Sequence, residues 1–319
     1  MQCKQPHELL KKKRRIRKEN CMNLQLFADS TASNPTYKAV VNPYQVTLVR
    51  NILVKGYINI LYGLASYYKN IPNYSTITTL PEENTEYIKK AIPNVTNCAS
   101  MLYSCKALTS VDTTGWDTSN VTNMNAMFAS CTKLQTIDVS SWNTSKVTNM
   151  QSMFYNCNAL KTLDVSKWDT SKVTTMNATF GGCYALTKLN VSNWDTSNVT
   201  NMTSMFYNCR LLTALDVSKW VTSKVTTMNA MFYNCKALTT LDLSNWDTSK
   251  VTNMCYMFYD CTSLTTIKGV IDMKSCTSYN RMFYNYPQLT GVKIKNPPSG
   301  VTATFAIGGL AAGKYEIVS

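Results

Sequence analysis

Seven cysteines stand 26 residues apart without a slip, and six tryptophans keep the same period. The cysteines are Cys105, Cys131, Cys157, Cys183, Cys209, Cys235 and Cys261. The tryptophans, which are all that the chain contains, are Trp116, Trp142, Trp168, Trp194, Trp220 and Trp246. A fixed period of this length is typical of a solenoid, in which each repeat buries its apolar side against its neighbours. We therefore expect stacked coils whose function lies on a surface made of repeated side chains.

Two spacings within one repeat predict the local structure of a coil. Inward positions recur at every third residue from Phe154 to Leu163, which indicates a helical turn followed by a bend. Leu163 and Val165 then alternate as in a strand, and the segment 173–176 is rich in β-branched residues, which favours a second short strand. The predicted fold is an α/β repeat solenoid, leucine-rich-repeat-like, with two short strands and one helical turn in each 26-residue coil.

The repeat divides the chain into segments. We expect a basic leader at 1–21, an N-terminal attachment or assembly module at 22–80, a capping helix at 81–91, a leucine-rich-repeat solenoid of about eight coils at 92–291 and a C-terminal cap at 292–319. The helix is predicted from proline and acidic residues at its start and lysines near its end, the order that the helix dipole favours. Within 22–80, the apolar stretches 46–54 and 58–61 fit either a helix or paired strands.

Charge is concentrated at the N-terminus. The net charge is +14, and residues 1–21 hold eight of the 32 basic side chains but only two of the 18 acidic ones. The remainder is mildly basic, which argues against sequence-specific recognition of nucleic acid. Three interpretations of the leader stay open: an extension ahead of a natural start at Met22, a disordered tail, and an arm that binds nucleic acid.

Several classes of function are excluded by missing residues. The only histidine is His7, outside the repeats, so the repeats hold no Ser/His/Asp triad, Cys/His dyad or histidine-based zinc site. The Gly308-Gly309 pair lacks the Lys-Ser/Thr of a nucleotide-binding loop. The most apolar stretch, 46–68, contains charged residues and is too polar for a membrane span, and no signal peptide is recognisable. We expect a protein that is not an enzyme and that has no cofactor, metal or membrane span.

Most repeated columns of side chains have a structural interpretation. The cysteines are expected to fill a narrow interior corner as reduced thiols, and the tryptophans are expected to fill a corner of the coil rather than to stack on sugars. The acidic columns are expected to accept backbone N–H groups at turns rather than to recruit cations. They comprise Asp112, Asp138, Asp164, Asp216 and Asp242 in the strand, and Asp117, Asp169, Asp195 and Asp247 after tryptophan.

A tyrosine column beside the predicted helical turn is the candidate binding face. It consists of Tyr155, Tyr207, Tyr233, Tyr259 and Tyr284, and it is interrupted by Ala129 and Gly181. Its place next to inward-facing phenylalanine predicts exposure. The alternative is a solvent-facing filler without a partner.

The repeat pattern Phe-x2-Cys-x2-Leu-x2-Leu/Ile-Asp-Val/Leu-Ser-x-Trp-Asp-Thr-Ser-x-Val-Thr-x-Met resembles the BspA-like leucine-rich repeat of bacterial surface proteins over residues 92–291. The resemblance implies a non-enzymatic solenoid used in adhesion or host contact, with no catalytic residues to carry over. The stretch Met-Asn-Leu-Gln-Leu-Phe-Ala from Met22 to Ala28 is similar to the opening of structural proteins of tailed bacteriophages.

These resemblances predict a recognition or adhesion protein encoded by a phage or prophage, a virion-associated component that contacts a host surface. A virion leaves its host by lysis, which explains why a surface protein can lack a signal peptide. The alternatives are a bacterial cell-surface adhesin with BspA-like repeats and an intracellular scaffold for protein–protein interaction. The expected partners are a protein or glycan on a cell surface and, through residues 22–80, other virion proteins; the expected location is the virion or the bacterial cell surface.

Overall fold

A computed structural model describes residues 78–80, 85, 88–90, 92–299 and 307–319. The chain divides into two compact units, Met1–Lys55 and Gly56–Ser319, and every described residue belongs to the second. The predictions for the basic leader, for the apolar stretch 46–68 and for most of the module at 22–80 lie outside the described residues.

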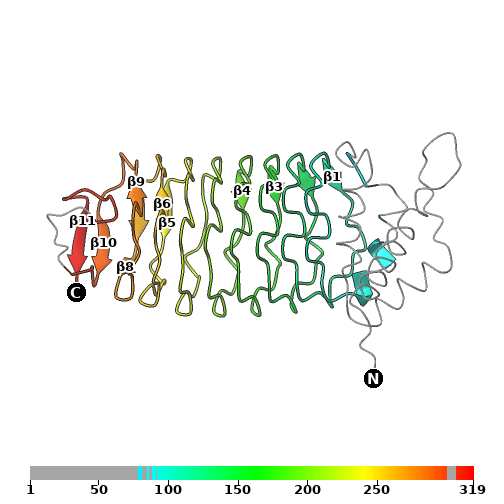
Figure 1. Cartoon of the computed structure of the whole chain (residues 1–319), viewed down its shortest axis with the longest axis horizontal. Helices are drawn as coiled ribbons and strands as arrows, with labels where there is room; N and C mark the ends of the chain where they lie inside the picture. Colours follow the sequence, from blue (N-terminus) through cyan, green and yellow to red (C-terminus); the bar gives the residue numbers. More distant parts are fainter. Residues whose placement is uncertain (1–77, 81–84, 86–87, 91, 300–306) are drawn as a thin grey trace, which may run out of the picture. The chain divides into compact units, whose positions relative to one another are not determined.

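The predicted solenoid is confirmed: successive coils lie side by side along one axis (Figure 1). The strands of the repeat are β1 (Ser110–Val111), β2 (Thr136–Ile137), β3 (Thr162–Leu163), β4 (Lys188–Leu189), β5 (Thr240–Asp242) and β7 (Thr266–Lys268). They pair in parallel as β1–β2, β3–β4 and β5–β7. Leu163 lies opposite Leu189, one period later, so each residue meets its own counterpart in the next coil. This register turns the repeated sequence into columns of like side chains.

The second predicted strand is shorter than expected. It consists of one bridging residue in each coil, and these residues pair in parallel from coil to coil. They are Asn97, Asn123, Asn149, Thr175, Asn201, Thr227, Asn253 and Ser278. Just before each bridge a threonine continues the ladder: the Thr174 N–H donates to the Thr148 carbonyl at 2.9 Å. Inward Val173 and Met176 are fully buried on either side of the bridge.

The predicted helical turn is replaced by a chain of tight turns. Between Met150 and Cys157, alternate N–H groups donate to the next coil, as from Phe154 to the Thr179 carbonyl at 2.9 Å. The N–H groups of Met153, Tyr155 and Cys157 close turns within the coil, each bonding to a carbonyl three residues earlier, and that of Gln151 donates to the Asn149 side-chain oxygen. Left-handed residues, Ser152 (φ 54°) and Asn156 (φ 58°), make this alternation geometrically feasible. An inward side chain still recurs every third residue, but the segment is held by its neighbouring coil and not by helical hydrogen bonds.

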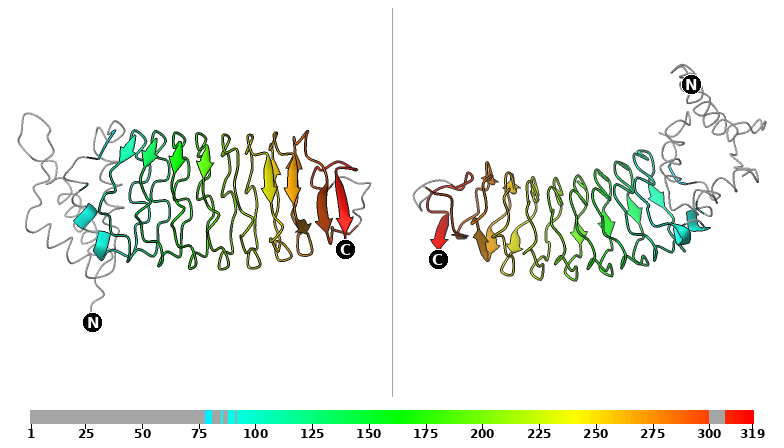
Figure 2. Two further views of the ribbon diagram at one scale, coloured as in Figure 1. Left: turned by 180° about the vertical axis from the view of Figure 1, so that it is seen from behind. Right: turned by 60° about the horizontal axis from the view of Figure 1, so that its bottom comes forward.

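The regular repeat changes at both ends. A 3-10 helix, η2 (Ile92–Asn94), precedes the first coil, and Thr85 and the residues 88–90 are α-helical. Near the C-terminus, β6 (Phe258–Tyr259) pairs with β9 (Phe283–Tyr284), and a parallel sheet has the order β11-β10-β8. Its strands are β8 (Val270–Asp272), β10 (Val292–Lys295) and β11 (Tyr315–Val318). Figure 2 shows the coils evenly stacked from the cyan end to the orange end. The capping roles of both ends stay predictions.

Two aromatic columns form the centre of the core. The phenylalanine rings from Phe128 to Phe283 stack on one another with centroids 5.2–6.2 Å apart. The tryptophan rings from Trp116 to Trp246 stack in the same way at 5.9–6.4 Å. Phe154 also contacts Trp168 at 6.5 Å, so the two columns pack together. Burial of these large rings in every coil provides the main apolar stabilisation of the solenoid.

Candidate recognition face

The tryptophan column is interior. Its side chains are at most 6% exposed, and the indole N–H of Trp168 donates to the Val139 carbonyl of the preceding coil at 3.1 Å. The same bond recurs in Trp194, Trp220 and Trp246. With its ring enclosed and its donor satisfied, none of these tryptophans presents a surface for a ligand.

The cysteine column is also interior, and its cysteines form no disulfide with one another. Each thiol from Cys131 to Cys261 donates to a carbonyl of the preceding coil, as Cys157 does to Phe128 at 3.2 Å. Burial raises the pKa of Cys183 and of Cys261 to about 12. Since the thiolate is the nucleophile and the metal ligand, this column is chemically inert at neutral pH. Across the described ranges, no cluster of His, Cys, Asp and Glu has the geometry of a metal site.

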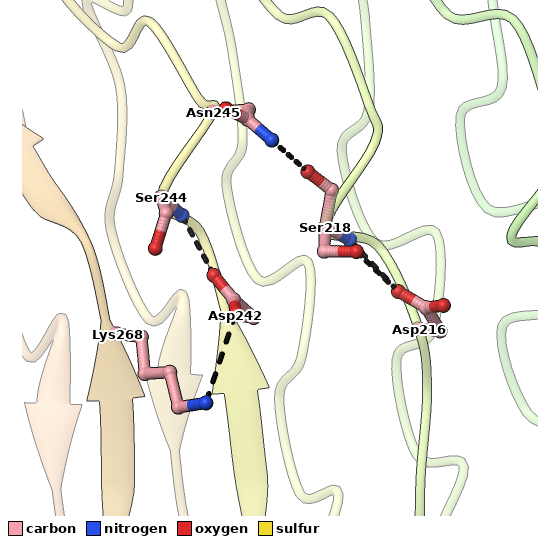
Figure 3. A network of polar contacts seen from close by, with 6 residues as sticks. All are labelled: Asp216, Ser218, Asp242, Ser244, Asn245 and Lys268. Carbon is pink, nitrogen blue, oxygen red and sulfur yellow. Dashed lines mark hydrogen bonds and ion pairs between the residues drawn. The ribbon is translucent and has the colours of Figure 1, made fainter.

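The acidic columns hold turns. The Asp242 carboxylate accepts the backbone N–H of Ser244 at 3.0 Å, and Asp216 accepts both the N–H and the hydroxyl of Ser218 (Figure 3). Lys268 approaches Asp242 at 3.9 Å. These hydrogen bonds favour the charged carboxylate and lower the pKa of Asp216 and of Asp242. The carboxylates are therefore committed to their own backbone, as expected of turn residues.

Four of the five predicted tyrosines form one continuous stack. The ring centroids of Tyr207 and Tyr233 are 4.8 Å apart, those of Tyr233 and Tyr259 are 4.7 Å apart, and those of Tyr259 and Tyr284 are 4.6 Å apart. We call these four residues the tyrosine stack. Its inner members are half-buried, and Tyr284 at its end is 49% exposed. Burial raises the pKa of Tyr233, with a further contribution from its neighbours Tyr207 and Tyr259.

The fifth tyrosine is separated from the stack. Gly181 stands between Tyr155 and Tyr207 in the column, and the Tyr155 ring lies over it: a Cβ on Gly181 would come within 3.1 Å of that ring. Gly182 has φ 78°, and a Cβ there would lie 2.2 Å from the Asn156 side chain. The space beside the two glycines is therefore filled by side chains of the preceding coil, and the stack ends at Tyr207.

Sequence reasoning missed the side chains that extend this face, because they break the repeat. Tyr256 replaces the small residue found in six other coils, and its ring meets Tyr233 edge-on at 6.4 Å and Tyr259 at 5.8 Å. Arg281 lies in the same column one coil later, above the ring of Tyr284. The sequence does mark these two residues, because each places an aromatic or an arginine side chain at a position that holds serine or alanine in the other coils.

Two stretches of the chain, residues 74–189 and 185–295, match the model of a family described as "Mycoplasma protein of unknown function, DUF285". Together the matches run from residue 74 to residue 295, more than half of the chain, and include the whole repeat region. The chain belongs to the DUF285 family. The DUF285 match agrees with the predicted resemblance to a repeat family, whereas the similarity to phage proteins, which depends on the undescribed Met22–Ala28, stays a prediction.

Comparison with other proteins adds little about the ligand of this DUF285 chain. No curated protein matches it. One matching solved structure is entitled "Crystal structure of TLR13-ssRNA13 complex"; it is 14% identical, and the match covers 83% of the DUF285 chain and 49% of that chain at a TM-score of 0.28. The DUF285 chain thus spans about half the length of that protein. Within its described part, no helix is both long and apolar enough to cross a membrane.

Proposed function

We propose that the chain is a non-enzymatic recognition protein that binds a protein on a cell surface through the tyrosine stack. The observation that carries the proposal is the unbroken stacking of Tyr207, Tyr233, Tyr259 and Tyr284 at 4.6–4.8 Å on the outside of the solenoid. Tyrosine is enriched at the energetic centres of protein interfaces, because it supplies a large contact area at a low cost in conformational entropy.

The stacking favours a protein over a glycan. A sugar ring binds to the open face of an aromatic ring, but within the stack each face is covered by the next tyrosine. What remains for a partner is a row of ring edges and hydroxyl groups. None of the described hydrogen bonds uses the hydroxyls of Tyr233 or Tyr259, so they are free to donate to or accept from a partner. Edges and hydroxyls in a row suit the mixed apolar and polar surface of a protein.

The place of display is part of the proposal. We place the solenoid on a virion that contacts a host surface, with residues 22–80 joining it to other virion proteins. The similarity of Met22–Ala28 to phage structural proteins supports this placement. Display on a bacterial cell as an adhesin, and an intracellular scaffold, are the alternatives. Proteomic analysis of purified virus particles, cell membranes and the soluble cell fraction distinguishes these three locations. Recovery of the chain only in the soluble fraction would contradict display on a surface.

The binding proposal is tested with the full-length chain on a panel of intact bacterial and mammalian cells. Binding is expected to be lost after the cells are treated with protease and to survive periodate oxidation of their glycans. Tyr233→Ala with Tyr259→Ala should weaken binding at least tenfold, because it removes the middle of the stack. The control is Thr148→Ala with Thr174→Ala, two exposed residues of another column. Loss of binding on periodate treatment would indicate a glycan, and full binding by the tyrosine variant would show that another face is used.

A further inference from the structure

Both arginines of the described ranges lie against tyrosine rings on the side of the coil that carries the tyrosine stack. The guanidinium carbon of Arg210 lies 4.7 Å from the ring centroid of Tyr184, and that of Arg281 lies 5.9 Å from the ring centroid of Tyr284. Both arginine side chains are exposed. Stacking on a ring fixes the plane of a guanidinium group while its outer N–H donors stay open to solvent.

Neither guanidinium forms an ion pair with another described residue. The ion pairs between described residues all use lysine: Lys236 with Asp260, Lys268 with Asp242, and Lys293 with Glu316. The Lys236–Asp260 pair, at 3.2 Å, lies between the two arginines along the solenoid. The opposite charges of this pair cancel, so it adds no net charge to the face. With the Asn234 amide turned over, the orientation that pairs its oxygen with donors, the Arg210 Nε also donates to the Asn234 side-chain oxygen at 3.2 Å. Its terminal nitrogens remain available for a ligand.

The arginines are separated along the axis by three coils, because Arg210 belongs to the coil of Phe206 and Arg281 to that of Phe283. At about 4.8 Å for each coil, this separation is about 14 Å. An extended peptide spans it with about four residues. The intervening surface is the tyrosine stack, whose hydroxyls are donors as well.

We infer that this face binds an acidic segment of a protein, whose carboxylates pair with Arg210 and Arg281 while its backbone and apolar atoms lie along the tyrosine stack. The inference rests on the proposed function and names the chemistry of its partner. It is carried by charge complementarity: two pre-positioned planar forks without counter-ions match carboxylates in bidentate geometry. Exposed Leu211, next to Arg210, adds apolar contact at one end of the face.

The first test measures binding of fluorescently labelled poly-L-glutamate to the full-length chain. Arg210→Gln with Arg281→Gln should weaken binding at least tenfold, and Arg210→Lys with Arg281→Lys should weaken it several-fold, because lysine keeps the charge but lacks the planar fork. The control is Lys172→Gln with Lys250→Gln, which removes the same charge from exposed residues of another column and should bind as the wild type does. An equal loss in the control, or binding of polyphosphate or hyaluronate but not of polyglutamate, would overturn the inference.

A second test separates this inference from the proposed function. In the cell-binding assay, the arginine pair and the tyrosine pair should both lose binding, and poly-L-glutamate should compete with the wild type. If the tyrosine variant loses binding while the arginine variant binds normally, the face is correct and the acidic partner is wrong. If neither variant loses binding, both the proposed function and this inference are wrong. Circular dichroism of each variant establishes that the solenoid remains folded.

Discussion

Trp142 and Trp168 occupy the same place in successive coils but differ in one hydrogen bond. Each stacks between two tryptophan neighbours, yet only Trp168 donates its indole N–H, whereas that of Trp142 has no partner among the described atoms. Trp→Phe removes the same volume at both sites, but only Trp168→Phe also removes a hydrogen bond, after which the Val139 carbonyl keeps the backbone N–H of Trp142 as its donor. We therefore expect Trp168→Phe to lower the free energy of unfolding by about 1 kcal/mol more than Trp142→Phe in urea titrations. Equal losses would show that this hydrogen bond adds nothing to stability.

The buried thiols should make stability depend on pH in the alkaline range. A cysteine ionises with an ordinary pKa of 9.0, but burial raises the pKa of Cys183 and of Cys261 to about 12, so the unfolded chain releases protons that the folded chain keeps. The stabilisation is complete below about pH 9 and is lost as the pH rises toward 12, because the unfolded state binds fewer protons there. The free energy of unfolding should fall from pH 8 to pH 11 in the wild type. It should fall less steeply in the variant that combines Cys157→Ala with Cys183→Ala. An unchanged slope in the variant would contradict this assignment, since lysine and tyrosine titrate equally in both proteins.

Substitutions in the acidic columns can show whether a turn is stabilised by the hydrogen-bond acceptor or by the negative charge of the side chain. Asp169 accepts the N–H of Ser171 at 3.0 Å, and Asn143 does the same for Ser145 one coil earlier. We expect Asp169→Asn to be nearly neutral and Asp169→Ala to destabilise by about 1 kcal/mol in urea unfolding, because only alanine lacks the acceptor. Equal effects of the two substitutions would point to the charge instead.

Val221 offers the reverse experiment in the same column. It stands where other coils have an acidic or amide side chain, and it is 46% exposed. Val221→Asn supplies an acceptor for the turn without adding a negative charge between Asp195 and Asp247. It should raise the free energy of unfolding by a few tenths of a kcal/mol, which thermal and urea unfolding can detect. Val221→Ala, which exposes less apolar surface but adds no acceptor, is the control and should not stabilise to the same extent.

The elements also show what the sequence could predict. Strict repetition predicted the coil, its register and the columns, because identical residues 26 apart must meet in a parallel stack. The helical turn was wrong in detail, since an inward residue at every third position fits both a helix and the alternating turns of Met150–Cys157. At the candidate face, the column revealed the tyrosines but not Arg210, Tyr256 or Arg281. Tyr256 and Arg281 depart from the serine or alanine of the other coils, and Arg210 stands at a position that varies from coil to coil. Their contacts also depend on the directions that left-handed turn residues impose.

For the whole molecule, nearest-neighbour stacking implies that one complete coil can be removed. Deletion of residues 180–205 joins Thr179 to Phe206 and removes one period of 26 residues, so every column realigns and Tyr155 becomes the neighbour of Tyr207. We expect a folded chain that unfolds in one transition at a somewhat lower urea concentration, because it loses one coil–coil interface. The control deletion, 180–192, removes half a period and places polar side chains opposite the core, so it should not fold. Circular dichroism and gel filtration distinguish these outcomes; equal behaviour of the two deletions would show that register between coils does not hold the solenoid together.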